Sequence, residues 1–376
     1  MKVLFVQNIA AIAGSEKYFL AIFPELIKRG IQVEFLNVFL KQDKNIAYEY
    51  SKQLSEVGVV VHELQVANFI TIKPVIKLHA LVRKRGFDIV HSHLIYSDFW
   101  NSLLKLIPFN NVRSISTLHG YQENLYVEYC LSPYKLPKTL YYRLMQFCLS
   151  RLDGVYSCSH GLKEFFSNVG LDKQNKIEVI QHGFEYPSIP YRTGKYRKGE
   201  IQLCIVGRLI PRKGHLFVLN GMPEILKRFP TLKLVIAGSG PFGVELQQKV
   251  IELGIEESVS FEGFCEEPIH VMADSDVVLV PSYAEGLPLV IFEAFKSESP
   301  VIAFDTVGPG EAIENGVDGI KVNAFDEDEM IKQTMRLIEN VELRQILANN
   351  AAESLTQKWT IERMTNETIS FYGRVL

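Results

Sequence analysis

Residues 276–296 read Asp276-Val-Val-Leu-Val-Pro-Ser-Tyr-Ala-Glu-Gly-Leu-Pro-Leu-Val-Ile-Phe-Glu-Ala-Phe-Lys296. The apolar run Val277–Val280, which an aspartate precedes and a proline follows, is typical of a strand buried on both faces. A polar turn comes next, and Pro288 suits the first turn of a helix, where a missing N–H costs no hydrogen bond. A strand, a turn with free backbone amides and a helix N-terminus form the arrangement with which α/β proteins bind anions.

Two glutamates stand in this stretch, Glu285 at the mouth of the turn and Glu293 inside the apolar helix. Eight residues of helix would separate them by roughly 12 Å along the axis, whereas the two carboxylates of a glycosidase lie about 5–9.5 Å apart. The pair therefore fits two side chains that hold the ends of one extended ligand. The alternative from spacing alone is a solvated Glu285 and a Glu293 that needs an ion-pair partner because it is buried.

The run Glu285-Gly286-Leu287-Pro288, followed by Glu293, resembles the E-x7-E signature of the family 4 (GT4) retaining glycosyltransferases, which have the GT-B fold. In that family, the first glutamate contacts the donor sugar and the second holds the ribose hydroxyls of the nucleotide. The resemblance implies a catalytic Glu285 and a donor site that includes Gly286, Leu287, Pro288 and Glu293.

The composition limits the class of protein. A chain of 376 residues is too long for one ordinary core and suggests two domains. The formal net charge of −3 gives no sign of nucleic-acid binding as a main activity. The first 190 residues are mildly basic, which suits an anionic acceptor or an anionic lipid surface. Five scattered cysteines favour a reducing compartment, and no apolar run is long enough to span a membrane.

The first half opens with a strand at Lys2–Val6, a helix that ends at Gly30 and a strand at Ile31–Phe39, the start of a doubly wound α/β sheet. Between the first strand and the helix, Ala13-Gly14-Ser15-Glu16 is similar to the Gly-Gly-x-Glu loop of the family. The amides of that loop approach the donor phosphates and the acceptor, which implies that Gly14 binds the donor. The alternative from the residues themselves is a simple tight turn.

Histidines follow two further strands of this half. We expect His91 and His93, at the end of the strand that starts at Phe87, to face opposite directions and hence not to share a metal. His119 comes directly after the strand Arg113–Leu118, and ligands of open α/β sheets bind just beyond such ends. The family commonly places a functional histidine there, near the reacting sugar, which implies a catalytic or positioning role for His119. A structural hydrogen bond is the alternative.

Residues 121–152 are rich in tyrosines and cations. This mixture suits a membrane interface, where aromatic rings lie at headgroup depth and cations meet anionic lipid. It equally suits a helix packed on the sheet with a solvated basic face. Residues 185–200 have the proline, glycine and polar composition of a linker between domains.

The second half begins with a strand at Ile201–Val206 and the loop Gly207-Arg208-Leu-Ile-Pro-Arg212-Lys213-Gly214. Cations on a loop beyond a strand end are what a diphosphate needs, because Arg grips oxygens bidentately and Lys supplies a point charge. The loop resembles the family's Gly-Arg-Leu…Lys-Gly motif, in which the Arg and Lys neutralise the donor diphosphate. The resemblance gives these catalytic roles to Arg208 and Lys213, with Gly207 in the donor site. A solvated basic loop is the alternative.

Two further loops extend the resemblance. After the strand Leu232–Ala237, the run Gly238-Ser239-Gly240-Pro241 matches the family's glycine turn, which lets the backbone approach the ligand and places Gly238 and Gly240 in the donor site. The loop after Val259–Phe264 holds the nucleobase through backbone groups in the family, which puts Cys265 beside the base. Four motifs thus occur in family order over residues 201–322.

The resemblance covers nearly the whole chain and implies an α/β protein of the GT-B fold, with two Rossmann-like doubly wound domains that face a central cleft. We expect an N-terminal acceptor-binding domain over residues 1–190 and a C-terminal nucleotide-sugar-binding domain over residues 191–358. A last helix within residues 359–376 is expected to cross back onto the first domain.

The implied reaction transfers a hexose-type sugar, with retention, from a UDP- or GDP-linked donor to a hydroxyl of a glycan or lipid-linked acceptor, in surface polysaccharide or glycolipid synthesis. No cofactor and no metal are expected, because cations can stabilise the leaving diphosphate and no Asp-x-Asp stands where metal-dependent transferases carry one. We expect a cytoplasmic protein, peripheral on anionic lipid at the inner face of the cell membrane, without a nucleic-acid partner. The alternatives are a GT-B sugar-nucleotide epimerase or hydrolase, and a non-catalytic sugar-nucleotide-binding subunit.

Overall fold

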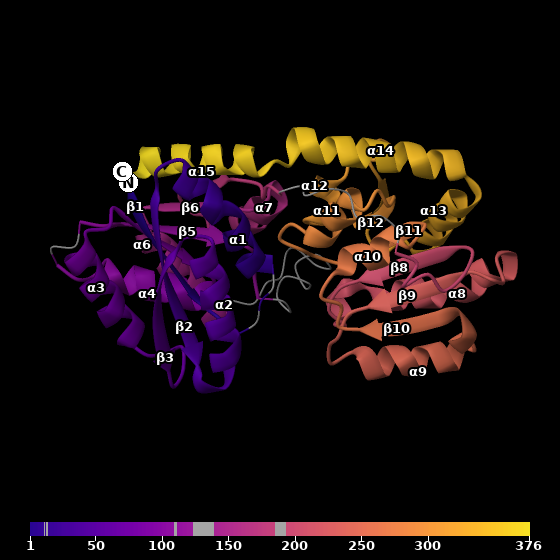
Figure 1. Cartoon of the computed structure of the whole chain (residues 1–376), viewed down its shortest axis with the longest axis horizontal. Coiled ribbons are helices and arrows are strands. Elements are labelled where there is room, and N and C mark those ends of the chain that lie inside the picture. Colours follow the sequence, from indigo (N-terminus) through magenta and orange to yellow (C-terminus); the bar gives the residue numbers. More distant parts are fainter. Residues whose placement is uncertain (11, 13, 109–110, 123–138, 185–192) are drawn as a thin grey trace. The chain divides into compact units, whose positions relative to one another are not determined.

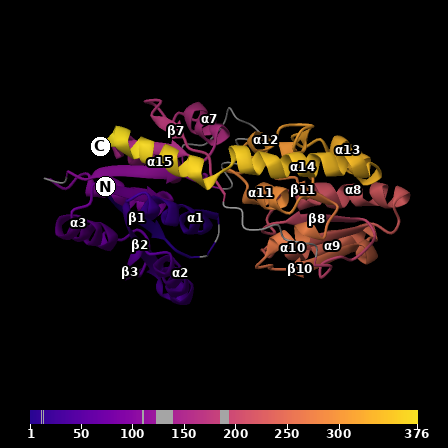
Figure 2. The ribbon, with the colours of Figure 1, turned by 45° about the horizontal axis from the view of Figure 1, so that its top comes forward.

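The computed structural model describes residues 1–10, 12, 14–108, 111–122, 139–184 and 193–376 (Figure 1). These residues form two compact units (Figure 2). The described residues of the first unit fall within 1–122, 139–184 and 360–376, and those of the second within 193–359. Each unit is built on one parallel sheet, so the predicted pair of doubly wound α/β sheets is confirmed.

The first unit contains a parallel sheet in the strand order β3-β2-β1-β4-β5-β6-β7. Its strands are β1 Lys2–Asn8, β2 Gln32–Leu40, β3 Val60–Val66, β4 Ile89–His93, β5 Arg113–Leu118, β6 Gly154–Ser157 and β7 Ile177–Val179. Its helices are α1 Gly14–Lys28, α2 Lys44–Glu56, α3 Lys73–Arg85, α4 Ile95–Leu104, α6 Leu140–Arg151, α7 His160–Asn168 and α15 Ile361–Val375.

Both faces of this sheet are buried. Alternate side chains of β1 enter different cores, with Phe5 among the residues of α1, α2 and α15 and Leu4 among those of α3 and α4. A strand covered on both sides must be apolar throughout, which explains the unbroken run at its start. The last helix, α15, completes the first of these cores with Met364, Phe371 and Tyr372.

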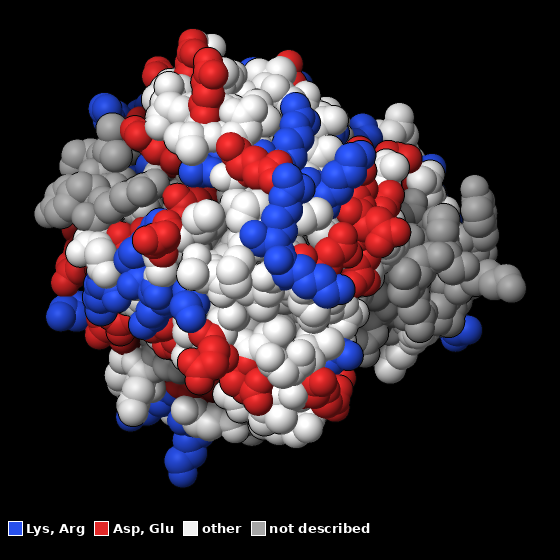
Figure 3. Space-filling model, turned by 90° about the vertical axis from the view of Figure 1, so that its right-hand side faces the viewer, with Lys and Arg blue, Asp and Glu red and all other residues white. Residues whose placement is uncertain are grey.

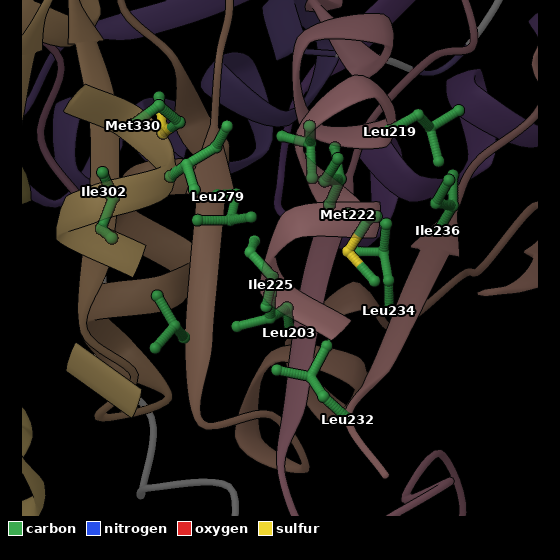
Figure 4. Close-up of a cluster of buried hydrophobic side chains, with 14 of the residues drawn as sticks. Leu203, Leu219, Met222, Ile225, Leu232, Leu234, Ile236, Leu279, Ile302 and Met330 are labelled. Atoms are coloured by element: carbon green, nitrogen blue, oxygen red, sulfur yellow. The ribbon is translucent and has the colours of Figure 1, made fainter. Parts of the chain in front are cut away.

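The second unit contains a parallel sheet in the strand order β10-β9-β8-β11-β12-β13. Its strands are β8 Gln202–Val206, β9 Lys233–Ala237, β10 Val259–Gly263, β11 Val277–Val280, β12 Val301–Asp305 and β13 Ile320–Asn323. Its helices are α8 His215–Arg228, α9 Gly243–Leu253, α10 Pro268–Ala273, α11 Leu289–Lys296, α12 Pro309–Ala312, α13 Glu327–Glu339 and α14 Val341–Lys358. Figure 4 shows one core of this unit, where side chains of α8 and α13 pack on β8, β9, β11 and β12.

Two segments of the second unit have a local structure that the sequence pattern alone does not show. The helical segment Glu327–Lys358 consists of two helices, α13 and α14, and Asn340 caps the second one with a side chain that accepts a hydrogen bond of 2.8 Å from the amide of Leu343. The described part of the expected linker is held by Asp274, whose carboxylate accepts hydrogen bonds of 2.9 Å from both Thr193 Oγ1 and the amide of Gly194. Residues 185–192 of that linker lie outside the described residues.

Candidate functional site

The strand order of the second sheet reverses between β8 and β11, which pair side by side. From β8 the chain proceeds to β9 on one side, and from β11 it proceeds to β12 on the other. Ligands of open α/β sheets bind beyond the carboxyl ends of the strands at such a switch point. The two loops that leave β8 and β11 here carry the predicted residues Gly207, Arg208, Lys213, Glu285, Gly286, Leu287 and Pro288.

Glu285 lies where these two loops meet. Its Oε2 is 2.7 Å from Arg212 Nη1, and its Oε1 is 2.6 Å from Lys213 Nζ. Only 8% of Glu285 is exposed, and burial alone would raise its pKa. The charges and hydrogen bonds of Lys213 and Arg212 oppose that effect and lower the pKa to about 2. The carboxylate is therefore ionised at neutral pH, and the three side chains together carry one net positive charge.

The alternative of a solvated Glu285 is therefore wrong. A buried carboxylate needs a charged partner, and the loop after β8 supplies two of them. Arg212 Nη1 also donates a hydrogen bond to the carbonyl of Ala284, the residue before the carboxylate. Because the amide of Tyr283 donates to the carbonyl of Arg212 at 2.9 Å, backbone and side-chain contacts join the two loops.

Two glycines allow neighbouring backbone segments at this switch point to approach each other closely. Gly214 has a φ of +71°, and a Cβ added there would lie 1.9 Å from the carbonyl oxygen of Pro281. Gly238, in the predicted glycine turn, has a φ of +154°, and its Cβ would lie 1.8 Å from the carbonyl oxygen of Gly207. No other residue fits at either position, since both the backbone conformation and the available space exclude a side chain.

The other predicted donor residues of this unit differ in burial. Arg208 and Gly240 are exposed, and Glu293 is half-buried in the second turn of α11. Cys265, after β10, is partly buried, with its Sγ 3.6 Å from Tyr196 Oη. Their assigned contacts with a donor remain predictions.

The first sheet has its own switch point, between β1 and β4. Gly14 is the first residue of α1, which follows β1, whereas Ala13 lies outside the described residues. Gln7, near the end of β1, donates hydrogen bonds from Nε2 to Ser15 Oγ at 3.1 Å and to the carboxylate of Glu16. The first turn of α1 is thus tied to the strand end at the switch point.

Four histidines cluster beside this point, of which His91, His93 and His182 are buried and His119 is half-buried. His93 Nδ1 is 2.7 Å from His119 Nε2, and the two rings stack with their centroids 5.0 Å apart. The centroid of His182, after β7, is 5.3 Å from that of His119. His91 Nδ1 is 2.7 Å from the hydroxyl of Tyr372, which α15 contributes.

The expectation that His91 and His93 face opposite directions is wrong. Side chains two residues apart on a strand lie on the same face, and these two ring centroids are 4.5 Å apart. Burial lowers the pKa of His91 to about 3, and burial with neighbouring histidines holds the pKa of His93 and of His119 well below the usual range. The rings are therefore neutral near pH 7, so one of the pair His93–His119 donates and the other accepts.

No cluster of His, Cys, Asp and Glu in the described part of the chain is arranged to hold a metal ion. Among the same residues, no helix combines the length and the apolar character needed to cross a bilayer.

A cavity of about 350 Å³ adjoins His119 and lies within the size range of small-molecule sites. Tyr96, Tyr121 and Tyr141 line it, together with Asp98, which receives a hydrogen bond of 2.7 Å from Ser92 Oγ. Burial raises the pKa of Asp98 to about 7, so this carboxyl group exists in both protonation states near neutral pH. No Lys or Arg is among the described residues that line the cavity.

Two family models match the sequence. The model for Glycosyltransferase Family 4 matches residues 12–186, and the model for Glycosyl transferases group 1 matches residues 192–354. Only residues 187–191 separate the two matched ranges. This chain belongs to the family 4 glycosyltransferases. The resemblance seen in its motifs is thereby confirmed at the level of the family.

Curated relatives agree with this assignment, and a solved structure shares the fold. The glycosyltransferase is 28% identical over 303 residues to an uncharacterized glycosyltransferase of Methanocaldococcus jannaschii, which covers 76% of this chain and 75% of the relative. It is 22% identical over 321 residues to the UDP-Gal:alpha-D-GlcNAc-diphosphoundecaprenol alpha-1,3-galactosyltransferase of Escherichia coli, covering 80% and 79% of the two chains. The crystal structure of Anabaena HepE in complex with UDP-glucose has a TM-score of 0.80, with 20% identity and full coverage of both chains. The GT-B fold is confirmed.

The sequence did not identify several residues at the ionic cluster of the second unit and at the histidine cluster and cavity of the first. Arg212 stands in the quoted loop directly before Lys213, but only the structure shows that it reaches the buried carboxylate of Glu285. Asp98 carries no local signal, since only the fold shows that it is buried beside the cavity. Tyr372 is 281 residues from its partner His91, so no local pattern could connect them.

Proposed function

We propose that this glycosyltransferase transfers a hexose-type sugar from a UDP- or GDP-linked donor to an acceptor hydroxyl, with retention of configuration. The Anabaena structure contains UDP-glucose, and the name of the Escherichia coli relative specifies UDP-Gal and a diphosphoundecaprenol-linked sugar. Both names favour a UDP-linked hexose. The second name supports an acceptor used in surface polysaccharide or glycolipid synthesis.

The observation that carries the proposal is the ionic cluster of Arg212, Lys213 and Glu285 at the switch point of the second sheet. Its net positive charge, on loops that begin at adjacent strand ends, suits a diphosphate group. With Arg208 from the same loop, Lys213 would stabilise the charge that develops on the leaving diphosphate. Such cations do the work that a divalent ion does elsewhere, so we propose transfer without a metal.

Glu285 and Glu293 have separate roles in this proposal. Glu285 orients the donor sugar and also fixes Lys213 and Arg212, whose flexible side chains would otherwise lose conformational entropy when the donor binds. Glu293, which lies on α11 eight residues after Glu285, holds the ribose hydroxyls of the donor. The glycine-dependent backbone approach around Gly207 and Gly238 gives the diphosphate access to main-chain amides.

The first unit supplies the acceptor side. His119 positions the acceptor or the sugar, and His93 fixes the orientation of that imidazole through the hydrogen bond of 2.7 Å. The tyrosine-lined cavity beside His119 offers ring faces and the Asp98 carboxyl group, which can donate or accept a hydrogen bond with a sugar hydroxyl. We propose same-face attack in which the leaving phosphate accepts the acceptor proton. A covalent sugar adduct trapped on a side chain would contradict that route.

A first experiment measures thermal stabilisation by a panel of nucleoside diphosphates and their sugars in EDTA. A ligand at a hundred times its Kd adds about 2.7 kcal/mol of stability. One nucleotide is expected to raise the melting temperature of the wild type, and Arg208→Ala and Glu293→Ala are expected to abolish the rise. No shift with any donor would refute the donor site.

A second experiment separates transfer from the alternative activities. The enzyme is incubated with the preferred donor, with and without glycan or lipid-linked acceptors, and sugar products are analysed by mass spectrometry. Product that requires acceptor supports transfer. Epimerised or hydrolysed sugar without acceptor would favour an epimerase or hydrolase, and donor binding without any turnover would favour a non-catalytic subunit.

A further inference from the structure

The loop before α3 and the first turns of that helix expose three isoleucines. Ile70 is 78% exposed, and Ile72 and Ile76 are each 62% exposed. Ile72 and Ile76 are one helical turn apart, and the amide of Ile76 donates to the carbonyl of Ile72 at 3.2 Å, so their side chains share one face. A single exposed isoleucine is ordinary, but three within seven residues concentrate exposed apolar side chains in one short segment.

Cations flank these isoleucines on the same helix. Lys73, Arg83 and Lys84 are exposed and Lys77 is half-buried. Lys73 and Lys77 are four residues apart, one helical turn, whereas Arg83 and Lys84 lie near the other end of α3. The helix contains no Asp or Glu. None of these four cations lies within 4.0 Å of a carboxylate in the described part of the chain, whereas Arg85 pairs with Glu34 at 2.9 Å. We call Ile70, Ile72, Ile76, Lys73, Lys77, Arg83 and Lys84 the α3 surface.

Several contacts fix the backbone of the loop at Phe69 and Ile70, just before α3. Trp100 Nε1 donates a hydrogen bond of 3.1 Å to the carbonyl of Phe69, and the side chain of Asn68 accepts one of 3.1 Å from the amide of Ile70. The ring of Phe69 packs on that of Tyr96, with the centroids 5.2 Å apart. Because Tyr96 lines the cavity at His119, the ring of Phe69, which directly precedes Ile70, contacts a residue of that cavity.

We propose that the α3 surface docks this glycosyltransferase on an anionic phospholipid bilayer. Exposed aliphatic side chains enter the boundary between headgroups and acyl chains, while lysines and arginines on the same helix meet lipid phosphates. Lys73 and Lys77 lie in the first two turns, where the helix dipole disfavours cations, and nearby phosphates would relieve that repulsion. The docking requires no sugar transfer. Delivery of a lipid-linked acceptor to the adjoining cavity rests on the proposed function.

Other occupants suit this surface less well. In a dimer with two-fold symmetry, the cations of one copy would face the same cations of the other copy and repel them. The surface of three isoleucines is also far smaller than the about 800 Å² that each partner of a stable dimer buries. A nucleic acid would use the cations but leave the isoleucines in water. By contrast, on the face of the second unit seen in Figure 3, cationic and acidic side chains are interspersed, and several cations of α8, α9 and α13 pair with acids.

The test is co-sedimentation of the full chain with vesicles made of equal parts phosphatidylcholine and phosphatidylglycerol, and with vesicles of phosphatidylcholine alone. The wild type is expected to sediment with the anionic vesicles at low salt and to be released by high salt. Lys73→Gln/Lys77→Gln is expected to weaken binding about 25-fold, since each cation near such a surface contributes about fivefold. Ile70→Ser/Ile72→Ser/Ile76→Ser is expected to weaken it at least about tenfold through lost apolar burial.

The matched control is Val244→Ser/Ile251→Ser on α9, where the residues are 79% and 57% exposed. This variant is expected to sediment like the wild type. Thermal melting of each variant checks that it is folded. Failure of the wild type to bind anionic vesicles, or equal binding by the two α3 variants and the wild type, would overturn the proposal. Vesicle binding without any sugar transfer would leave it standing and count only against the proposed function.

Discussion

Replacing Glu285 by glutamine tests the ionic cluster at the switch point. The substitution keeps the shape of the side chain but leaves Arg212 and Lys213 half-buried without their shared counter-charge. The pKa of Glu285 falls from an ordinary 4.5 to about 2, which corresponds to about 3 kcal/mol of stability at pH 7. Loss of one partner from a buried ion pair has a cost of the same order.

The stabilisation that ionised Glu285 provides depends on pH, and the depressed pKa sets the direction of that dependence. Because the folded pKa is depressed, the contribution is complete above the unfolded pKa of 4.5 and is lost as the pH falls toward about 2. At pH 3.5 it is expected to have fallen from about 3 to about 2 kcal/mol. The difference in unfolding free energy between wild type and Glu285→Gln should shrink by that amount on acidification.

The assay is urea unfolding followed by tryptophan fluorescence. The chain has two tryptophans, Trp100 in the first unit and Trp359 in the second, where Trp359 packs on Phe292 of α11 with ring centroids 4.7 Å apart. In a Trp100→Phe background the fluorescence therefore reports the unit that contains Glu285. Glu314→Gln is the control, since its pair with Lys358 is exposed and contributes less than about 1 kcal/mol. Equal stability of wild type and Glu285→Gln at pH 7, or a difference that acidification leaves unchanged, would refute the reasoning.

Three further substitutions test other contacts. Gly238→Ala is expected to lower the free energy of unfolding by about 2 kcal/mol or more in urea titrations, because its Cβ would lie 1.8 Å from the carbonyl oxygen of Gly207; wild-type stability would contradict the close approach. Burial raises the pKa of Asp98 from 3.8 to about 7, so the folded state retains a proton that the unfolded state releases, and wild-type stability should fall as the pH rises from about 4 to about 7. Urea titrations of Asp98→Asn over this range should lack that fall, and an identical profile would count against a buried carboxyl group. His93→Phe is expected to lower kcat at least about tenfold, whereas His93→Gln, whose amide can still bond His119, retains more activity; equal losses in initial-rate assays would argue for simple packing.

Much of the fold was predictable because its central strands are covered on both faces. The predicted strands Val277–Val280 and Arg113–Leu118 have the bounds that the structure shows. Two outer strands, β3 at Val60–Val66 and β13 at Ile320–Asn323, were not predicted. Their side chains are partly exposed, which interrupts the apolar run that identified the others.

The candidate sites were predictable only in part. Parallel strands bring their carboxyl ends to one edge, so the loops after β8 and β11 could be expected near each other once both strands were recognised. Which side chains meet there depends on the backbone of each loop. Lys213 and Arg212 follow one another in a short 3-10 turn and reach different oxygens of one carboxylate, a detail that sequence spacing does not encode.

The histidine cluster shows how a local rule and a distant contact combine. The strand periodicity of two, correctly applied, places His91 and His93 on one face. That face is buried by α15, whose Tyr372 hydroxyl is 2.7 Å from His91 Nδ1, and by α1, whose Phe19 ring lies 4.4 Å from that of His93. Neutral imidazoles are stable there because the surrounding rings exclude water, and burial is the main cause of their lowered pKa. The helix that completes this environment is thus the last one in the chain, so the surroundings of the His93–His119 pair depend on residues at both ends of the sequence.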